Sequence, residues 1–211
     1  MEFSNKVTMS INDWHKYQDD DDVEFAFGKV AFLSNRPNSH KHIYSEEVIR
    51  EYAPTVLGKW VVCEYDKYIQ DVTSHTDNQK ICGLVCPNQE VQFEYDSDGY
   101  LVASVNVMIS KIYATEVYEL FKKDNYRSVS IEEMVGFTPE TQDFVDGKQE
   151  KVITGFNICG ITILGKRVNP SVPLAHMTLT KMSEYSDIYT KYAQKNKLGN
   201  LWSCNMQNPY S

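Results

Sequence analysis

Short β-rich segments separated by turn signals run through most of the 211-residue chain. In the segment 101–109, every second residue from Ala103 to Ile109 is apolar, which is the pattern of a strand with one buried face. The preceding segment 96–99 (DSDG) is typical of a tight turn between antiparallel strands. The regular alternation of strand and helix that builds a doubly wound parallel sheet is missing. A largely antiparallel barrel or sandwich is therefore expected.

Similar patterns recur along the rest of the chain, and helical spacing interrupts them in three places. Strands are predicted over 23–33, 58–65, 81–86, 90–95, 101–109, 126–137 and 151–164, and helices over 46–52, 111–124 and 183–197. Ser45 is a good N-cap for the first helix, and Pro54 ends it. The fold class predicted from these patterns is mostly β (α+β): an antiparallel barrel of about seven strands surrounded by a few helices.

Length, composition and charge exclude several classes of protein. The chain contains no apolar run of the ~18–20 residues that a membrane helix needs, and its N-terminal residues lack the pattern of a signal peptide. A net charge of −8 argues against a large nucleic-acid-binding face. The organisation expected is a flexible arm over 1–22, one domain over 23–199 and a tail over 200–211.

The histidines and cysteines give no sign of a metal site. His40 and His42 lie two residues apart, as two ligands on a strand would, but no third ligand is apparent. The five cysteines are odd in number and irregular in spacing, and most have apolar neighbours, which predicts buried free thiols in a reducing compartment. Phosphate-binding, dinucleotide-binding and zinc-protease motifs are also missing, so no cofactor is expected.

Two polar residues in β-rich surroundings are candidates for chemistry. His75 lies in a polar loop before the strand 81–86, and Ser130 follows the helix 111–124. A serine hydroxyl becomes a nucleophile when a neutral imidazole takes its proton. The spacing of the two residues gives no distance between them, so chemistry alone leaves a surface histidine and an ordinary strand serine as the simpler interpretation.

The order of four segments resembles the phage prohead (capsid maturation) serine proteases, which share a fold with the herpesvirus assemblins. The similar segments are 35–59, 72–85 (VTSHTDNQKICGLV), 109–132 and 153–175, within a span from Val23 to Ala175. The family carries a histidine in the second of these segments and a serine in the third. The resemblance implies an assemblin-like barrel and a serine endopeptidase.

The resemblance also implies roles for particular residues. His75 matches the family's general base, and Ser130 matches its nucleophile. Ser128 is the alternative nucleophile, because it faces the same side of a strand, but Ser130 is preferred because Glu132 follows it as in the family pattern. Where many relatives carry the third, acidic member, this chain has Gly160.

Two further elements of the family site are assigned with alternatives left open. Asn157 is the nearest polar side chain to Gly160 that can orient the imidazole, although it is equally an ordinary strand asparagine. Gly165, Lys166 and Arg167 resemble the assemblin loop that stabilises the oxyanion, although they also fit a basic turn at a strand end.

The function expected from the resemblance is the processing of scaffold and major capsid proteins inside an immature capsid in the host cytoplasm. Self-cleavage and a homodimer are further expectations, whereas nucleic acid, membrane, metal and cofactor are not expected partners. The first alternative is a catalytically inactive protein of the same fold that acts in capsid assembly. The second is an unrelated antiparallel β binding module, which predicts that His75 and Ser130 lie far apart.

Overall fold

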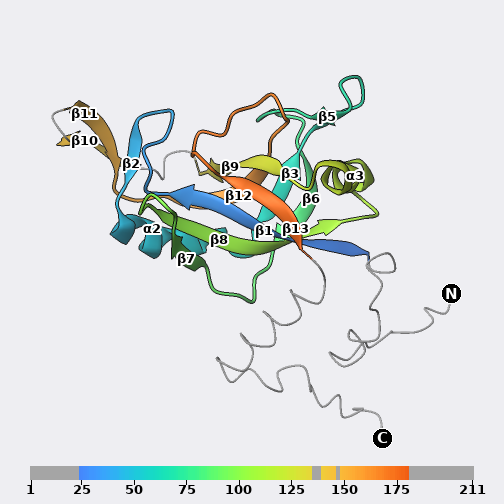
Figure 1. The fold of residues 1–211 in the computed structure, drawn as a ribbon, viewed down its shortest axis with the longest axis horizontal. Coiled ribbons are helices and arrows are strands. Elements are labelled where there is room, and N and C mark those ends of the chain that lie inside the picture. The colour runs from blue at the N-terminus through green and yellow to red at the C-terminus, as the bar shows by residue number, and fades with distance from the viewer. Residues whose placement is uncertain (1–23, 135–138, 146–147, 181–211) are drawn as a thin grey trace, which may run out of the picture.

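A computed structural model describes residues 24–134, 139–145 and 148–180 of the chain (Figure 1). The predicted N-terminal arm 1–22, the C-terminal helix 183–197 and the tail 200–211 lie outside these residues. None of the helices found in the described part is long and apolar enough to cross a membrane.

Seven strands form a closed barrel at the centre of the molecule. They are β1 (Phe25–Ser34), β3 (Trp60–Cys63), β6 (Lys80–Val85), β8 (Leu101–Ser110), β9 (Arg127–Glu133), β12 (Ile158–Ile163) and β13 (His176–Thr180). Their spatial order is β1-β13-β9-β12-β3-β6-β8, and pairing of β1 with β8 closes the ring. The predicted fold class, a mostly β barrel of about seven strands with few helices, is confirmed.

Smaller elements flank this barrel (Figure 1). Strand β7 (Gln92–Tyr95) extends the sheet beyond β8, and β4 (Tyr65–Asp66) pairs with β5 (Asp71–Val72). A separate sheet contains β10 (Glu140–Val145), β11 (Lys148–Ile153) and β2 (His42–Tyr44). The helices are α2 (Glu46–Tyr52), the following 3₁₀ turn η1 (Ala53–Val56), and α3 (Thr115–Asp124). Figure 1 shows α2 and the small sheet at one end of the barrel, with α3 and β5 at the other.

Local sequence explains α2 well. The Ser45 side chain accepts a hydrogen bond from the Val48 main-chain N–H at 3.2 Å, which satisfies one of the free donors at the helix start. Glu46 and Glu47 in the first turn and Arg50 in the last favour the helix dipole. The predicted boundaries 46–52 are those observed.

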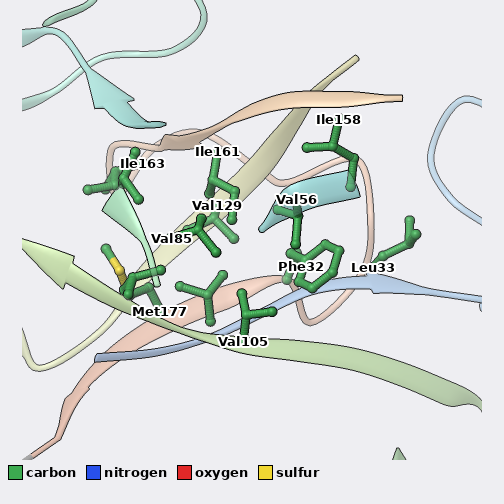
Figure 2. Close-up of a cluster of buried hydrophobic side chains, with 14 of the residues drawn as sticks. Phe32, Leu33, Val56, Val85, Val105, Val129, Ile158, Ile161, Ile163 and Met177 are labelled. Carbon is green, nitrogen blue, oxygen red and sulfur yellow. The ribbon is translucent and has the colours of Figure 1, made fainter. Parts of the chain in front are cut away.

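Alternating apolar residues of the barrel strands fill its interior (Figure 2). Val129, Ile161 and Met177 come from three adjacent strands, β9, β12 and β13, and each is fully buried. The inward positions of β8 are those predicted from the alternation between Ala103 and Ile109, and all of them are buried. Because neighbouring residues of a strand face opposite sides, the outward positions of β9 and β12 are fixed as well.

The pairing of the strands differs in two respects from a simple antiparallel order in which consecutive strands pair. Strands β12 and β3 are parallel, so the barrel is mixed. Strand β8 lies between β6 and β7, the two strands that precede it in the chain. The pairing of β12 with β3 and of β6 with β8 is decided by closure of the barrel and not by a local turn, so no local signal marks either pair.

The strand boundaries also needed correction. The predicted strand 151–164 is two strands of different sheets, β11 and β12, separated by residues 154–157. The strands β2, β5, β10 and β13 were not predicted. They have three, two, six and five residues, and these short segments carry too little pattern.

The cysteine prediction holds for three of the five residues. Cys63, Cys82 and Cys86 are free and buried, whereas Cys159 is free but exposed. The pairing of β12 with β9 shifts register between Ile158 and Gly160, and this bulge leaves Cys159 outside the core. Cys204 lies outside the described residues.

Candidate active site

The outward face of β9 carries the residues singled out from the sequence. Val129 is fully buried in the core, so Ser128, Ser130 and Glu132, at every second position, share the opposite face. Ser130 is nonetheless only 9% exposed. The polar side chains of this strand therefore lie on the barrel wall beneath neighbouring segments and not at an open edge.

Strand β12 completes the floor of the site. Thr162 lies directly opposite Ser130, and Gly160 lies directly opposite Glu132. A Cβ atom added to Gly160 would stand 3.2 Å from the Trp60 carbonyl oxygen and 3.6 Å from Glu132 Cγ. Position 160 is therefore tightest against the main chain of β3, while the Glu132 side chain lies at ordinary van der Waals distance.

His75 contacts Glu132 across 57 residues of sequence. The distance from His75 Nδ1 to Glu132 Oε1 is 2.7 Å. Since an ionised carboxylate only accepts hydrogen bonds, Nδ1 carries the proton and the Nε2 lone pair is the basic site of the neutral ring. The pair is partly exposed, with 43% of the His75 side chain and 29% of the Glu132 side chain accessible.

Two more side chains hold the carboxylate in place. Thr162 Oγ1 donates to Glu132 Oε1, and Gln79 Nε2 donates to the same oxygen at 3.3 Å. Gln79 Nε2 also donates to Thr162 Oγ1 at 2.9 Å, which links the loop after His75 to β12. Glu132 is thus a shared acceptor whose position is fixed from both β12 and the histidine loop.

These contacts keep Glu132 ionised. Burial raises the pKa of Glu132, but the hydrogen bonds from Thr162, His75 and Gln79 together outweigh it and lower the pKa below its usual 4.5. A carboxyl group whose pKa is lower in the folded protein contributes stability above its unfolded pKa and loses it as the pH falls.

We therefore expect the unfolding free energy of the wild type to exceed that of Glu132→Gln above pH 4.5. The gap should shrink as the pH falls below 4.5, the usual pKa of a glutamate. Urea unfolding at several pH values measures both curves. A gap that does not shrink as the pH falls below 4.5 would show that Glu132 is not stabilised in its charged form.

The loop that carries His75 is fastened to the turn after β12. The main-chain N–H of Gly165 donates to the Thr73 carbonyl at 2.9 Å, and a Cβ at position 165 would overlap the Val72 carbonyl oxygen. The Leu164 N–H donates to the Ser128 carbonyl at 2.9 Å on the other side. The turn therefore joins the histidine loop to β9, and the close approach requires glycine at 165.

Ser130 and His75 lie on the same part of the barrel wall, but no hydrogen bond joins them in the described ranges. His75 contacts Glu132, and same-face neighbours on a strand are roughly 6.6 Å apart along its axis. Catalytic hydrogen bonds are often long in the absence of substrate and tighten in the complex. The fold therefore brings His75 and the Ser130 hydroxyl into one site. The hydrogen bond between them, through which a proton would pass, is not formed in the described residues.

Ser128 also has a histidine close to it, on the neighbouring strand β13. His176 on β13 lies directly opposite Ser128. Its Nδ1 donates to the Leu174 carbonyl at 2.6 Å, and its ring stacks on Tyr126 with centroids 5.4 Å apart. No carboxylate contacts this imidazole among the described residues, so of the two histidines next to the β9 serines, only His75 has an acidic partner.

The structure gives the contact with the imidazole to Glu132 and not to Asn157. Asn157 lies beyond Glu132 along the paired strands, where its carbonyl accepts from the Met134 N–H at 2.9 Å. Asn157 therefore lies opposite Met134, outside the cluster around His75. The alternation of Ser128, Ser130 and Glu132 was the sequence signal that could have identified the acid; Gln79 and Thr162 carried none.

The predicted oxyanion turn is only partly available. The N–H of Gly165 donates to Thr73, and the N–H of Lys166 donates to Asp71 Oδ2 at 2.9 Å. Within the described part of the chain, the N–H of Arg167 has no such partner, and its side chain is exposed. Of the three residues predicted to stabilise the oxyanion, Arg167 is therefore the one whose main-chain N–H is available to a substrate oxygen.

The rings of His40 and His42 make their contacts with each other and with Glu140, and not with the residues around His75. Their ring centroids are 6.0 Å apart, and His42 Nε2 lies 3.8 Å from Glu140 Oε2. The described residues contain no group of three or more histidine, cysteine, aspartate or glutamate side chains able to hold a metal ion.

No protein-family model, curated protein or solved structure matches the chain.

Proposed function

We propose that the chain is a serine endopeptidase of the phage prohead type. Ser130 is the nucleophile, His75 the general base, and Glu132 the residue that orients the base. The observation that carries this proposal is the 2.7 Å contact between His75 Nδ1 and Glu132 Oε1, because Glu132 lies two residues from Ser130 on the same strand face. Such a contact leaves Nε2 free to accept a hydroxyl proton.

The reaction follows from these roles. The Ser130 Oγ attacks the peptide carbonyl carbon while its proton passes to His75 Nε2, and the same proton then passes to the leaving amine as the C–N bond breaks. Water attacks the acyl ester, gives a proton to His75, and the proton returns to Ser130 as the acid leaves. Donors at Arg167 are candidates to stabilise the anionic oxygen. These steps use side chains of the chain and water alone.

An apolar surface next to the site supports a peptide substrate. Trp60 and Ile81 on β3 and β6 are 51% and 53% exposed. Trp60 pairs with Gly160 on β12, which in turn pairs with Glu132, so one row of positions runs from the acid to the indole. An extended peptide lying across these strands would cover this apolar surface and gain free energy from its burial.

The substrates proposed are scaffold and major capsid proteins, with the enzyme itself as a further substrate. The work would be done inside an immature capsid in the host cytoplasm, and a homodimer is part of the same proposal. These statements rest on the resemblance of the segments described above.

A second candidate function is capsid assembly by an inactive protein of the same fold. The observation that favours it is the missing hydrogen bond between Ser130 and His75 in the described ranges. The 2.7 Å hydrogen bond between His75 Nδ1 and Glu132 favours the enzyme, because a structural protein has no need to orient a half-exposed imidazole.

Proteolysis of unfolded casein separates the two candidates. Reduced casein is incubated with wild type, Ser130→Ala and Ser128→Ala, and new peptide termini are identified by mass spectrometry. We expect cleavage by wild type and by Ser128→Ala, and none by Ser130→Ala.

Cleavage by Ser130→Ala at the wild-type rate would contradict Ser130 as the nucleophile. Failure of all three proteins to cleave casein, or scaffold and capsid proteins added to the same reactions, would favour the assembly function.

A further inference from the structure

A buried arginine lies where the three segments of the proposed site meet. Arg127 is the first residue of β9, three residues before Ser130, and only 2% of its side chain is exposed. Its Nη2 lies 2.7 Å from Asp124 Oδ2 and 3.4 Å from Asp71 Oδ1, and its Nη1 donates to the Tyr126 carbonyl at 2.9 Å. One guanidinium therefore holds two carboxylates from different elements.

Asp71 connects this arginine to the histidine loop. It belongs to β5, four residues before His75, and is 16% exposed. Its Oδ2 accepts from the Lys166 N–H at 2.9 Å, so the same side chain also holds the turn after β12. A change in the position of Asp71 would move both the start of the histidine loop and that turn.

Asp124 makes the second connection. It ends α3, is 17% exposed, and its Oδ1 accepts from Lys166 Nζ at 2.7 Å. Arg127 and Lys166 thus hold the two oxygens of one carboxylate. The result is a closed set of contacts among the serine strand, the histidine loop and the turn 164–167, with Arg127 at its centre.

We propose that Arg127 is a positioning residue that sets the place of His75 relative to Ser130. This inference rests on the proposed function and adds a residue that does not touch the substrate. The guanidinium is suited to the task because the Nη1 hydrogen bond to the Tyr126 carbonyl fixes the planar group while Nη2 meets both carboxylates, whereas a lysine ammonium is a single flexible point charge. Asp71 transmits the position of the fork to the loop that carries His75.

Arg127→Lys is the variant that tests the proposal, because it keeps the charge and removes the fork. Arg36→Lys is the matched control: Arg36 also bridges two carboxylates, with Nη2 2.8 Å from Asp96 and 2.7 Å from Asp98, but at the turn between β7 and β8. Both variants lose a guanidinium that lies between two aspartates, and they differ only in where that guanidinium lies in the fold.

Two readouts are needed, one of which is independent of activity. The first is the downfield proton resonance of the His75 Nδ1–H held by Glu132, assigned by its absence in His75→Gln. The second is the rate of labelling by a small fluorophosphonate probe. In Arg127→Lys we expect the resonance to shift or disappear and labelling to slow by roughly 10–100-fold, since a misplacement of about 1 Å costs that much. Arg36→Lys should match wild type in both.

An unchanged resonance and labelling rate in a folded Arg127→Lys protein would overturn the proposal. If that variant does not fold, Asp71→Asn replaces it, since the amide keeps one acceptor oxygen and loses the charge; wild-type values there would overturn the proposal equally. Wild-type protein that shows the resonance but is never labelled would contradict the proposed protease. The role of Arg127 in placing His75 would then still be decided by the resonance.

Discussion

Replacing Glu132 with glutamine is expected to slow acylation of Ser130 by a factor of about 10²–10⁴ while the fold is retained. The amide is nearly isosteric with the carboxylate, but it carries no charge and can present its NH₂ group to Nδ1. It therefore no longer selects the tautomer in which Nε2 accepts the serine proton. It also cannot stabilise the imidazolium that forms during attack.

The matched control is Glu133→Gln on the same strand. Glu133 is the next residue, faces the other side of β9, and accepts from the Tyr44 hydroxyl at 2.9 Å. The second-order rate of fluorophosphonate labelling is measured for both variants. A Glu132→Gln rate within about three-fold of wild type would show that the 2.7 Å contact has no part in activating Ser130.

Gly165→Ala is expected to destabilise the protein by about 1–3 kcal/mol and to reduce labelling in the remaining folded protein. The added Cβ would overlap the Val72 carbonyl oxygen, which is main chain and cannot rotate away. Relief requires the turn and the histidine loop to separate, which also breaks the hydrogen bond from the Gly165 N–H to Thr73. The loop bearing His75 is then displaced from β9.

Gly155→Ala serves as the control for this substitution. A Cβ at position 155 would lie 3.3 Å from Tyr52 Cζ, the end of a side chain that can adjust. Denaturant unfolding gives the stability of each variant, and the probe gives the activity. A Gly165→Ala protein with the unfolding midpoint of the wild type would show that the turn and the loop are not in the close contact described.

Local features of the sequence predicted those parts of the fold that depend on a few neighbouring residues. The helix α2 was predicted with its boundaries because Ser45 and Pro54 act on adjacent main-chain groups. The hairpin of β7 and β8 followed from the 96–99 turn, where Gly99 has φ +83°. Parallel pairing of β12 with β3 depends on closure of the barrel and has no local signal.

Part of the candidate site could also be predicted from local sequence. Alternation places Ser128, Ser130 and Glu132 on one face of a strand, so Glu132 could have been identified from the sequence as the acid nearest to the serines. The contact of His75 with Glu132 is a tertiary one, as is the buried guanidinium of Arg127 between two aspartates. Such contacts depend on how the loops cover the barrel, which spacing does not specify.

The most direct test of the account is the location of a fluorophosphonate adduct in the intact protein. Wild type, Ser130→Ala, Ser128→Ala and His75→Ala are exposed to the probe, and tandem mass spectrometry identifies the modified residue. We predict one adduct on Ser130 in the wild type and in Ser128→Ala, with none in Ser130→Ala or His75→Ala. An adduct on Ser128, or no adduct on any of the four with scaffold and capsid proteins present, would contradict a serine protease built on Ser130, His75 and Glu132.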